Sequence, residues 1–275
     1  MTEPPPVPRP GMPEGPPWPG APGAPPLPPH VRNPVWYALI TRAQHAATEV
    51  EDFCLPAWRR RTRGEKRWPV TITVAVAIVL QLRLPDQLSL RPVPSVLLPI
   101  LEAALGIALI IANPVRFERQ SVALRWASLV LILLITAANA ASAVRLIQEI
   151  LGSRAGGSAG PLLASGASIW ITNVIAFALW YWEFDRGGPV HRAHATIQYP
   201  DFLFPQMTVD ELTPPDWEPR FLDYLYLSFT NATAFSPTDV MPMARWAKLT
   251  MAVQSAVSLG LGALVIARAV NILPG

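Results

Sequence analysis

The chain has 275 residues, of which 51% are hydrophobic and 15% are charged, and its formal net charge is +3. Globular proteins carry about 25% charged residues, and here the charges gather in residues 59–67 and 183–223, with long apolar stretches elsewhere. This distribution predicts an integral membrane protein, and so small a net charge does not indicate a nucleic-acid partner. Cys54 is the only cysteine, which excludes an internal disulfide and a cysteine-based metal cage.

Residues 1–34 form a proline-rich arm, because 15 of them are proline and almost none are aliphatic. Such a composition cannot bury enough apolar surface to fold, so we expect a disordered arm with polyproline II character. Two interpretations stay open for it: a solvated tether, or a ligand for a proline-binding protein.

Residues 35–67 combine an amphipathic helix with a basic segment. Trp36, Leu39 and Ile40 begin an apolar stripe at helical spacing that runs to Phe53, and the segment is too polar to cross a bilayer. The basic residues that follow are Arg59, Arg60, Arg61, Arg63, Lys66 and Arg67. A basic cluster directly before an apolar stretch predicts a cytoplasmic anchor on anionic lipid headgroups, and hence a cytoplasmic N-terminus.

Residues 68–275 are predicted to be a transmembrane helical domain. Its five apolar stretches are 69–84, 93–112, 124–147, 161–182 and 247–272. Most of them approach the roughly 20 residues that a bilayer requires, so we expect an all-α, polytopic membrane helix bundle of about five transmembrane helices. The first stretch is short, and it either spans or forms one arm of a re-entrant hairpin.

The polar segment 183–223 is expected to form an irregular cap, and residues 224–235 are too few to span. We therefore predict a short re-entrant or interfacial helix before the last span.

Residues 221–272 resemble the pore module of tetrameric cation channels. Ser228, Phe229, Thr230 and Thr233 match the pattern of its pore helix, and Asp239 and Pro242 match the residues just after its filter. Each chain holds one such module, so the resemblance implies a homotetramer.

The resemblance fails at the filter itself. Potassium channels have glycines there, which let the backbone turn its carbonyl groups inward. Here Ser236 and Thr238 replace both glycines, and Pro237 fixes the backbone between them. A potassium-type carbonyl ring is therefore not expected, and the narrowest ring of a pore would consist of hydroxyl groups or of Asp239 carboxylates.

The chain from residue 69 to 272 also resembles a family of uncharacterised bacterial inner-membrane proteins. The residues that carry this likeness are Leu227-Ser228-Phe229, Asp239-Val240 and Val270-Asn271. The resemblance implies a multi-pass protein of the inner membrane and brings no assigned activity.

Charge and topology give conflicting indications about the pore. If residues 59–67 are inside, four crossings place the 183–223 loop inside and Gly275 outside, whereas channel pore segments enter from outside. Either the first stretch does not span, or the likeness to a pore is ancestral or coincidental.

Single polar residues in the apolar stretches suggest functional roles. Glu102 lies midway along the second stretch, where a carboxylate either couples to protons or cations, or has a structural role in which it is protonated or paired with an arginine from another helix. Asn139 and Asn173 are expected to join helices by hydrogen bonds. Gln254 lies on a small, polar side of the last helix, which suits either close packing or a pore lining.

The sequence contains no recognisable nucleotide-binding or hydrolase motif, and His191 and His194 alone are a weak metal signal. We therefore expect no catalytic, cofactor or metal site, and no enzyme. The leading hypothesis is a channel-like or transporter-like protein for small ions. The alternative is a membrane scaffold that recruits partners through its proline-rich arm and basic segment. The predicted ion-pathway residues are Glu102, Thr233, Ser236, Thr238, Asp239 and Gln254.

Overall fold

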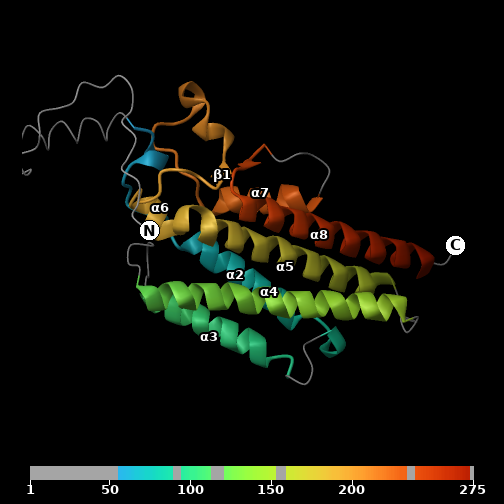
Figure 1. Cartoon of the computed structure of the whole chain (residues 1–275). Helices are drawn as coiled ribbons and strands as arrows, with labels where there is room; N and C mark the ends of the chain where they lie inside the picture. Colours follow the sequence, from blue (N-terminus) through green and yellow to red (C-terminus); the bar gives the residue numbers. More distant parts are fainter. Residues whose placement is uncertain (1–54, 89–93, 113–120, 153–158, 234–238, 273–275) are drawn as a thin grey trace, which may run out of the picture. The chain divides into compact units, whose positions relative to one another are not determined.

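The computed structural model describes residues 55–88, 94–112, 121–152, 159–233 and 239–272. They belong to one compact unit, Leu55–Gly275. In these ranges the chain forms seven α-helices and one short pair of antiparallel strands (Figure 1). The proline-rich arm and the amphipathic helix expected up to Cys54 lie outside the described residues.

Three helices are long and apolar enough to cross a membrane, judged by length and composition: α4 (Val122–Leu151), α5 (Ala159–Phe184) and α8 (Arg245–Ile272). They contain 30, 26 and 28 residues. At a rise of about 1.5 Å per residue, each exceeds the roughly 30 Å hydrocarbon core of a bilayer. The predicted all-helical fold is confirmed, with three candidate membrane spans among the described residues, and the count of about five spans stays a prediction.

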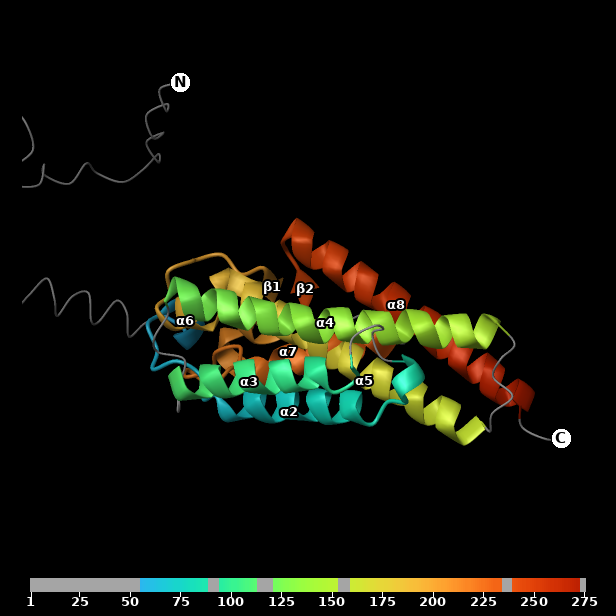
Figure 2. The ribbon, with the colours of Figure 1, turned by 90° about the horizontal axis from the view of Figure 1, so that it is seen from below.

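Two shorter apolar helices complete the bundle. They are α2 (Trp68–Leu82) and α3 (Leu97–Ala112), with 15 and 16 residues. Figure 2 shows α3 beside α2 and α4, and α2 also packs against α5. Proline fits the first turn of a helix because its missing N–H has no helical partner there, and Pro69 occupies that position in α2.

The residues at the start of α4 and at the end of α5 are suited to helix termini. The Ser121 hydroxyl accepts a hydrogen bond from the Leu124 N–H (3.2 Å), which caps α4. After α5 the chain reverses through Arg186, Gly187 and Gly188, whose φ angles are +49°, +76° and +103°. Glycine adopts such angles without strain, so the glycine pair allows the sharp turn.

The short helix predicted before the last span is α7 (Phe221–Thr233), which packs against both α5 and α8. The Asp223 carboxylate accepts a hydrogen bond from the Arg220 N–H (2.8 Å) at its start. Beyond residues 234–238 the chain forms β2 (Met241–Pro242), which pairs with β1 (Phe202–Leu203) so that Phe202 faces Pro242. The chain therefore returns to the 183–223 loop before α8 begins.

The 183–223 loop is an irregular cap, as expected. It contains the short helix α6 (Pro189–Ala193), strand β1 and several 3-10 turns. It lies at the end of the bundle where α2 begins (Figure 1), and the Thr62 N–H donates to the Ala193 carbonyl there (2.8 Å).

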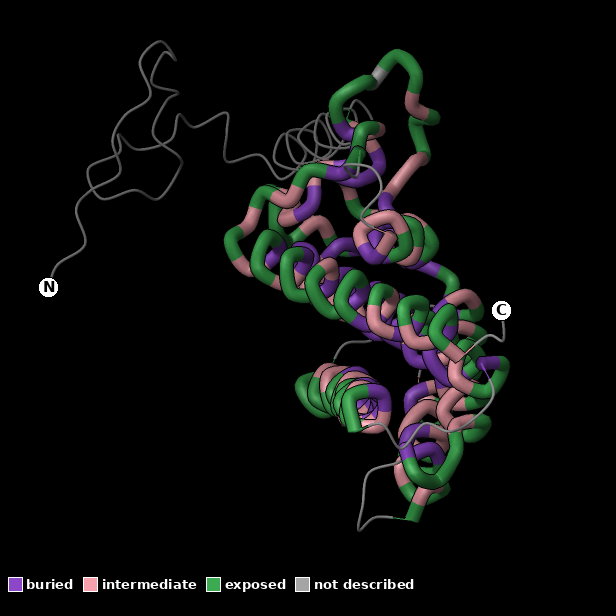
Figure 3. Tube along the Cα trace, turned by 90° about the vertical axis from the view of Figure 1, so that its right-hand side faces the viewer, coloured by how far each residue is buried: buried purple, intermediate pink, exposed green. Residues whose placement is uncertain are grey.

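Burial divides each helix into an inner and an outer side (Figure 3). The core near the cap is rich in aromatic residues, including Tyr181, Trp182, Phe202, Phe221 and Tyr224. A second core cluster, which includes Leu146, Ile169 and Leu261, is aliphatic. Large apolar side chains such as Ile111 and Val122 stay 75% and 77% exposed, which is the pattern that lipid-facing helices require.

Candidate functional site

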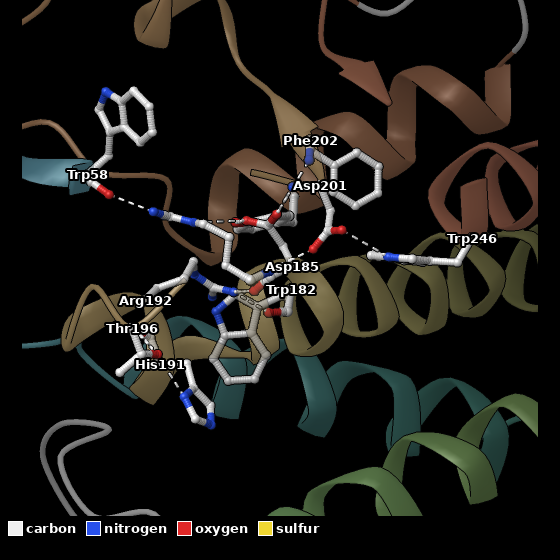
Figure 4. A network of polar contacts seen from close by, with 11 residues as sticks. Trp58, Trp182, Asp185, His191, Arg192, Thr196, Asp201, Phe202 and Trp246 are labelled. Atoms are coloured by element: carbon white, nitrogen blue, oxygen red, sulfur yellow. Dashed lines mark hydrogen bonds and ion pairs between the residues drawn. The ribbon is translucent and has the colours of Figure 1, made fainter. Parts of the chain in front are cut away.

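Charged and aromatic side chains, most of them buried, are joined by hydrogen bonds where the cap meets the bundle. We call these residues the cap network, and Figure 4 shows much of it. Its members are Trp58, Glu65, Trp182, Asp185, Arg186, Arg192, Asp201, Tyr224 and Trp246.

Asp185 is the centre of the cap network. It directly follows α5 and has no exposed surface. Its Oδ2 accepts a hydrogen bond from the Tyr224 hydroxyl (2.5 Å), and its Oδ1 accepts one from the Asp201 N–H (2.9 Å). The Arg186 Nε lies 3.8 Å from the same carboxylate. Oδ1 also accepts a longer hydrogen bond from the Phe202 N–H (3.4 Å). The burial of this carboxylate is thus offset by three donors and a cation.

Two buried arginines donate to backbone carbonyls. Arg186 Nη1 donates to the Trp58 carbonyl (2.5 Å), and Arg192 Nη1 donates to the carbonyls of Trp182 (2.6 Å) and Asp185 (2.9 Å). The last carbonyls of a helix lack partners within it, so Arg192 satisfies groups at the end of α5. Its guanidinium also lies 5.0 Å from the centre of the Tyr224 ring, a cation–π distance.

Glu65 holds the basic segment against two helices. Its carboxylate accepts hydrogen bonds from Trp182 Nε1 (2.8 Å) and from the Phe221 N–H (2.6 Å). Burial raises the pKa of Glu65, while the Trp182 hydrogen bond and the charge of Arg192 act in the opposite direction. The segment before α2 is therefore part of the folded bundle.

The predicted membrane-surface anchor is mostly accessible. Arg59, Arg61, Arg63 and Lys66 are exposed and Arg60 is half-buried, whereas Arg67 is only 8% exposed. All but Arg67 are thus accessible to a membrane surface.

The cap network also fixes the start of α8. Asp201 Oδ1 accepts a hydrogen bond from Trp246 Nε1 (3.1 Å), and its Oδ2 accepts one from the Arg186 N–H (2.8 Å) (Figure 4). The network thereby connects the basic segment, the end of α5, α7 and the start of α8. Its chemistry is that of a structural clamp.

A second polar cluster joins α5, α7 and α8 inside the bundle. Gln254 of α8 has no exposed surface, and its Nε2 donates to the carbonyl (2.9 Å) and hydroxyl (2.6 Å) of Ser228. Its Oε1 accepts from the Tyr181 hydroxyl (2.7 Å) and from Asn231 Nδ2 (2.7 Å). We call these four residues the module cluster, and within it every polar atom of the Gln254 side chain is engaged.

The predicted ion-pathway residues do not all lie together. Thr233 ends α7, where its hydroxyl donates to the Thr230 carbonyl (2.8 Å), and Asp239 is exposed just before β2. Ser236 and Thr238 lie outside the described residues, and Gln254 belongs to the module cluster.

Glu102 lies apart from those residues, on α3, which packs against α2 and α4. It has no exposed surface, and the Gln81 side chain of α2 interacts with its carboxylate. Neither carboxylate oxygen makes a hydrogen bond of standard geometry with the described residues. No arginine partner for this carboxylate is therefore seen in the described part of the chain.

The asparagines of the two long apolar helices α4 and α5 differ. Asn173 Nδ2 donates to the Ser258 hydroxyl (2.9 Å), which joins α5 to α8. Asn139 is 4% exposed, and its Oδ1 has no hydrogen-bond partner among the described residues.

The two histidines of the cap have protein partners. His191 Nδ1 lies 2.8 Å from the Thr196 hydroxyl, and His194 Nδ1 lies 2.8 Å from the Val190 carbonyl. Partial burial and the charge of Arg125 lower the pKa of His191. No group of three or more potential metal ligands occurs within the described ranges.

The cap network was not predicted as a site. Its one local signal is the succession of Glu183, Asp185 and Arg186 directly after an aromatic run, followed by two glycines.

Comparison of the chain with models of protein families, with curated proteins and with solved structures finds no match.

Proposed function

We propose that the chain is a membrane protein that conducts small ions through a homotetrameric pore built from α5, α7 and α8. The observation that carries this proposal is the position of α7. It is too short to span, and it packs against both long helices. The Ser228 hydroxyl of α7 donates to the Val174 carbonyl of α5 (2.7 Å), and Gln254 of α8 donates to Ser228 (2.6 Å). A short helix held between an outer and an inner span is the arrangement that a tetrameric pore module requires.

The exposure of α8 supports assembly. Only 28% of the 18-residue apolar segment of α8 is buried within the chain, compared with 56% of the corresponding segment of α5. Its exposed apolar side chains include Val253, Val257 and Ile266. In the proposed tetramer, neighbouring copies cover part of this surface and lipid covers the remainder.

The segment between Thr233 and Asp239 would line the narrowest part of the pore. It has no glycine, so hydroxyl groups and the Asp239 carboxylates would face the ion instead of a ring of backbone carbonyls. Four carboxylates around one axis favour cations over anions. We propose a cation pathway without potassium-type selectivity.

The proposed orientation counts α2 and α3 as two further spans, which gives five crossings. The basic segment and the cap lie at the same end, because Glu65 bonds to Trp182 and Phe221. That end carries most of the arginines, so the positive-inside rule assigns it to the cytoplasm. The module would then open toward the cytoplasm, inverted relative to tetrameric cation channels.

The test measures the oligomeric state of the protein and the flux of cations through it. Native mass spectrometry of the full chain in lipid nanodiscs is expected to give a tetramer. Liposomes that contain the protein should show cation flux, and Asp239→Asn should reduce it while leaving the tetramer intact. Asp216→Asn is the matched control, since Asp216 is an exposed acid of the cap, and it should leave flux unchanged.

The scaffold alternative gives the opposite result. A monomer without flux contradicts the pore. If deletion of residues 1–34 then removes the cellular phenotype while Asp239→Asn does not, the chain acts as a scaffold.

A further inference from the structure

A cavity of about 230 Å³ lies between α2, α3, α4 and α5, and no residue of α7 or α8 lines it. Its walls are mainly aliphatic, with Val74 and Ile78 from α2, Ile107 from α3, and Leu131 from α4 among them. A mainly apolar cavity with a few polar groups is the usual form of a small-molecule site.

The polar groups of the cavity gather at the cap end. They are Arg67 and Thr71 at the start of α2, Arg125 and Ser128 at the start of α4, and Glu183 at the end of α5. Along α2 the lining continues from Arg67 to Ile78, which corresponds to about 16 Å of helix. The cavity is thus elongated and amphipathic, with one polar end and one apolar end.

The polar end carries a surplus of positive charge. It contains two guanidinium groups and one carboxylate, and Glu183 Oε1 already accepts a hydrogen bond from the Ser128 hydroxyl (3.1 Å). Arg125 donates to the Gly187 carbonyl, which holds its guanidinium at the cavity. The exposed Lys66 adds to the positive field nearby. The matching ligand therefore has an anionic head and an apolar tail.

We propose that this cavity binds one anionic phospholipid, with an acyl chain between the helices and the phosphate beside Arg125 and Arg67. The cavity walls belong to apolar helices, so the bilayer itself supplies the occupant. The positive potential of the basic segment concentrates anionic lipids at this surface. The proposal does not depend on ion conduction. On α5 the cavity is lined by Leu179, Trp182 and Glu183, whereas Tyr181 and Val174 make the hydrogen bonds to α8 and α7.

Gly106 provides a selective way to fill the cavity. It lines the cavity, and a Cβ at this position would meet no atom within 4 Å. Gly106→Leu should therefore occupy the space of the acyl chain without displacing backbone. Gly160→Leu is the matched control, because a Cβ there also meets nothing within 4 Å and Gly160 is outside the cavity lining.

The experiment is native mass spectrometry of the full chain, delipidated and then mixed with phosphatidylglycerol or with phosphatidylcholine of identical acyl chains. The wild type should retain one phosphatidylglycerol per chain, about tenfold more readily than phosphatidylcholine. Gly106→Leu should lose both lipids, and Gly160→Leu should behave as the wild type. Arg125→Gln should abolish the preference for phosphatidylglycerol, and Arg125→Lys should keep it.

Three outcomes would overturn the proposal. They are equal retention of the two lipids by the wild type, unchanged retention by Gly106→Leu, and a preserved headgroup preference in Arg125→Gln. A thermal unfolding curve for each variant separates lost binding from lost folding, and Arg125→Lys supplies the anionic-lipid readout if Arg125→Gln fails to fold.

Discussion

At the scale of single residues, the buried charges fall into two kinds. Glu65 accepts hydrogen bonds from two protein donors and Asp185 accepts them from three, whereas Glu102 accepts none of standard geometry from the described residues. An unpaired buried polar group costs stability, while a satisfied one costs little or contributes. The same residue type should therefore respond in opposite directions at these positions.

Replacement of Glu65 should destabilise the protein. Glu65→Gln leaves one acceptor oxygen for two donors, the Trp182 indole and the Phe221 N–H. We expect the free energy of unfolding to fall by about 1–3 kcal/mol, measured by thermal unfolding in detergent. Glu211→Gln, at an exposed position of the cap, should have no measurable effect.

The pH dependence of the same group has a definite sign. The pKa of Glu65 is raised in the folded state from its ordinary value of 4.5. At a pH between these two values, Glu65 therefore holds a proton in the folded protein that it has released in the unfolded chain. This contribution to stability is full below the ordinary pKa of 4.5. It is lost as the pH rises through the folded-state value. Unfolding curves recorded from pH 4.5 upward through the folded-state pKa of Glu65 should show a fall in the free energy of unfolding of the wild type. The fall should be smaller in Glu65→Gln.

Replacement of Glu102 should have the opposite effect. Glu102→Met removes two buried carboxylate oxygens that accept no hydrogen bond of standard geometry from the described residues, while keeping an unbranched side chain. We expect the free energy of unfolding to rise by about 1–3 kcal/mol, with Glu149→Met on α4 as the control within about 0.5 kcal/mol. Loss of stability together with loss of cation flux would instead show that Glu102 holds an ion or a proton in the native protein.

At the scale of elements, α5 is the central helix, because it packs against α2, α4, α7 and α8. Close approach to α8 depends on a small residue. A Cβ at Gly166 would lie 2.8 Å from Val265 Cγ1, and β-branched valine has little freedom to move away. Small residues at membrane helix interfaces commonly permit such contacts.

Gly166→Ala should therefore weaken the α5–α8 contact. Crowding of this kind costs about 1–3 kcal/mol, which exceeds the gain in helix propensity from glycine to alanine. Gly160→Ala, in the same helix with open space around its Cβ, should be neutral or stabilising. Equal effects of the two variants on thermal unfolding would contradict the close packing inferred at Gly166.

The helices could be predicted from the sequence because each apolar stretch is a local signal. The expected 124–147 and 161–182 correspond to α4 and α5, and the twelve apolar residues before the last span became α7. The cap network could not be predicted, because its partners are remote: Arg186 and Trp58 are 128 positions apart, and Trp182 and Glu65 are 117 apart. Charges in a polar loop also suggest solvation, and only the folded chain buries them.

At the scale of the whole described unit, the two ends of the bundle differ in chemistry. The cap end contains the aromatic core, the cap network and the exposed arginines of the basic segment. The core cluster around Leu146, Ile169 and Leu261 is aliphatic. This asymmetry is what the positive-inside rule acts on, so the orientation can be tested directly.

Cysteine labelling from one side of the membrane tests this orientation. Cys54 is the only native cysteine, so Cys54→Ser gives a background for single introduced cysteines. Tyr199 in the cap is 79% exposed, and Leu151 at the opposite end of α4 is 69% exposed. With the cap in the cytoplasm, a membrane-impermeant maleimide should label Leu151→Cys from outside in intact cells. It should label Tyr199→Cys only in inverted vesicles.

The reverse pattern would put the cap outside, which restores the orientation of tetrameric cation channels and requires the basic segment to face away from the cytoplasm. Labelling of both positions from the same side would contradict a single crossing by α5, the helix between them, and with it the five-span topology.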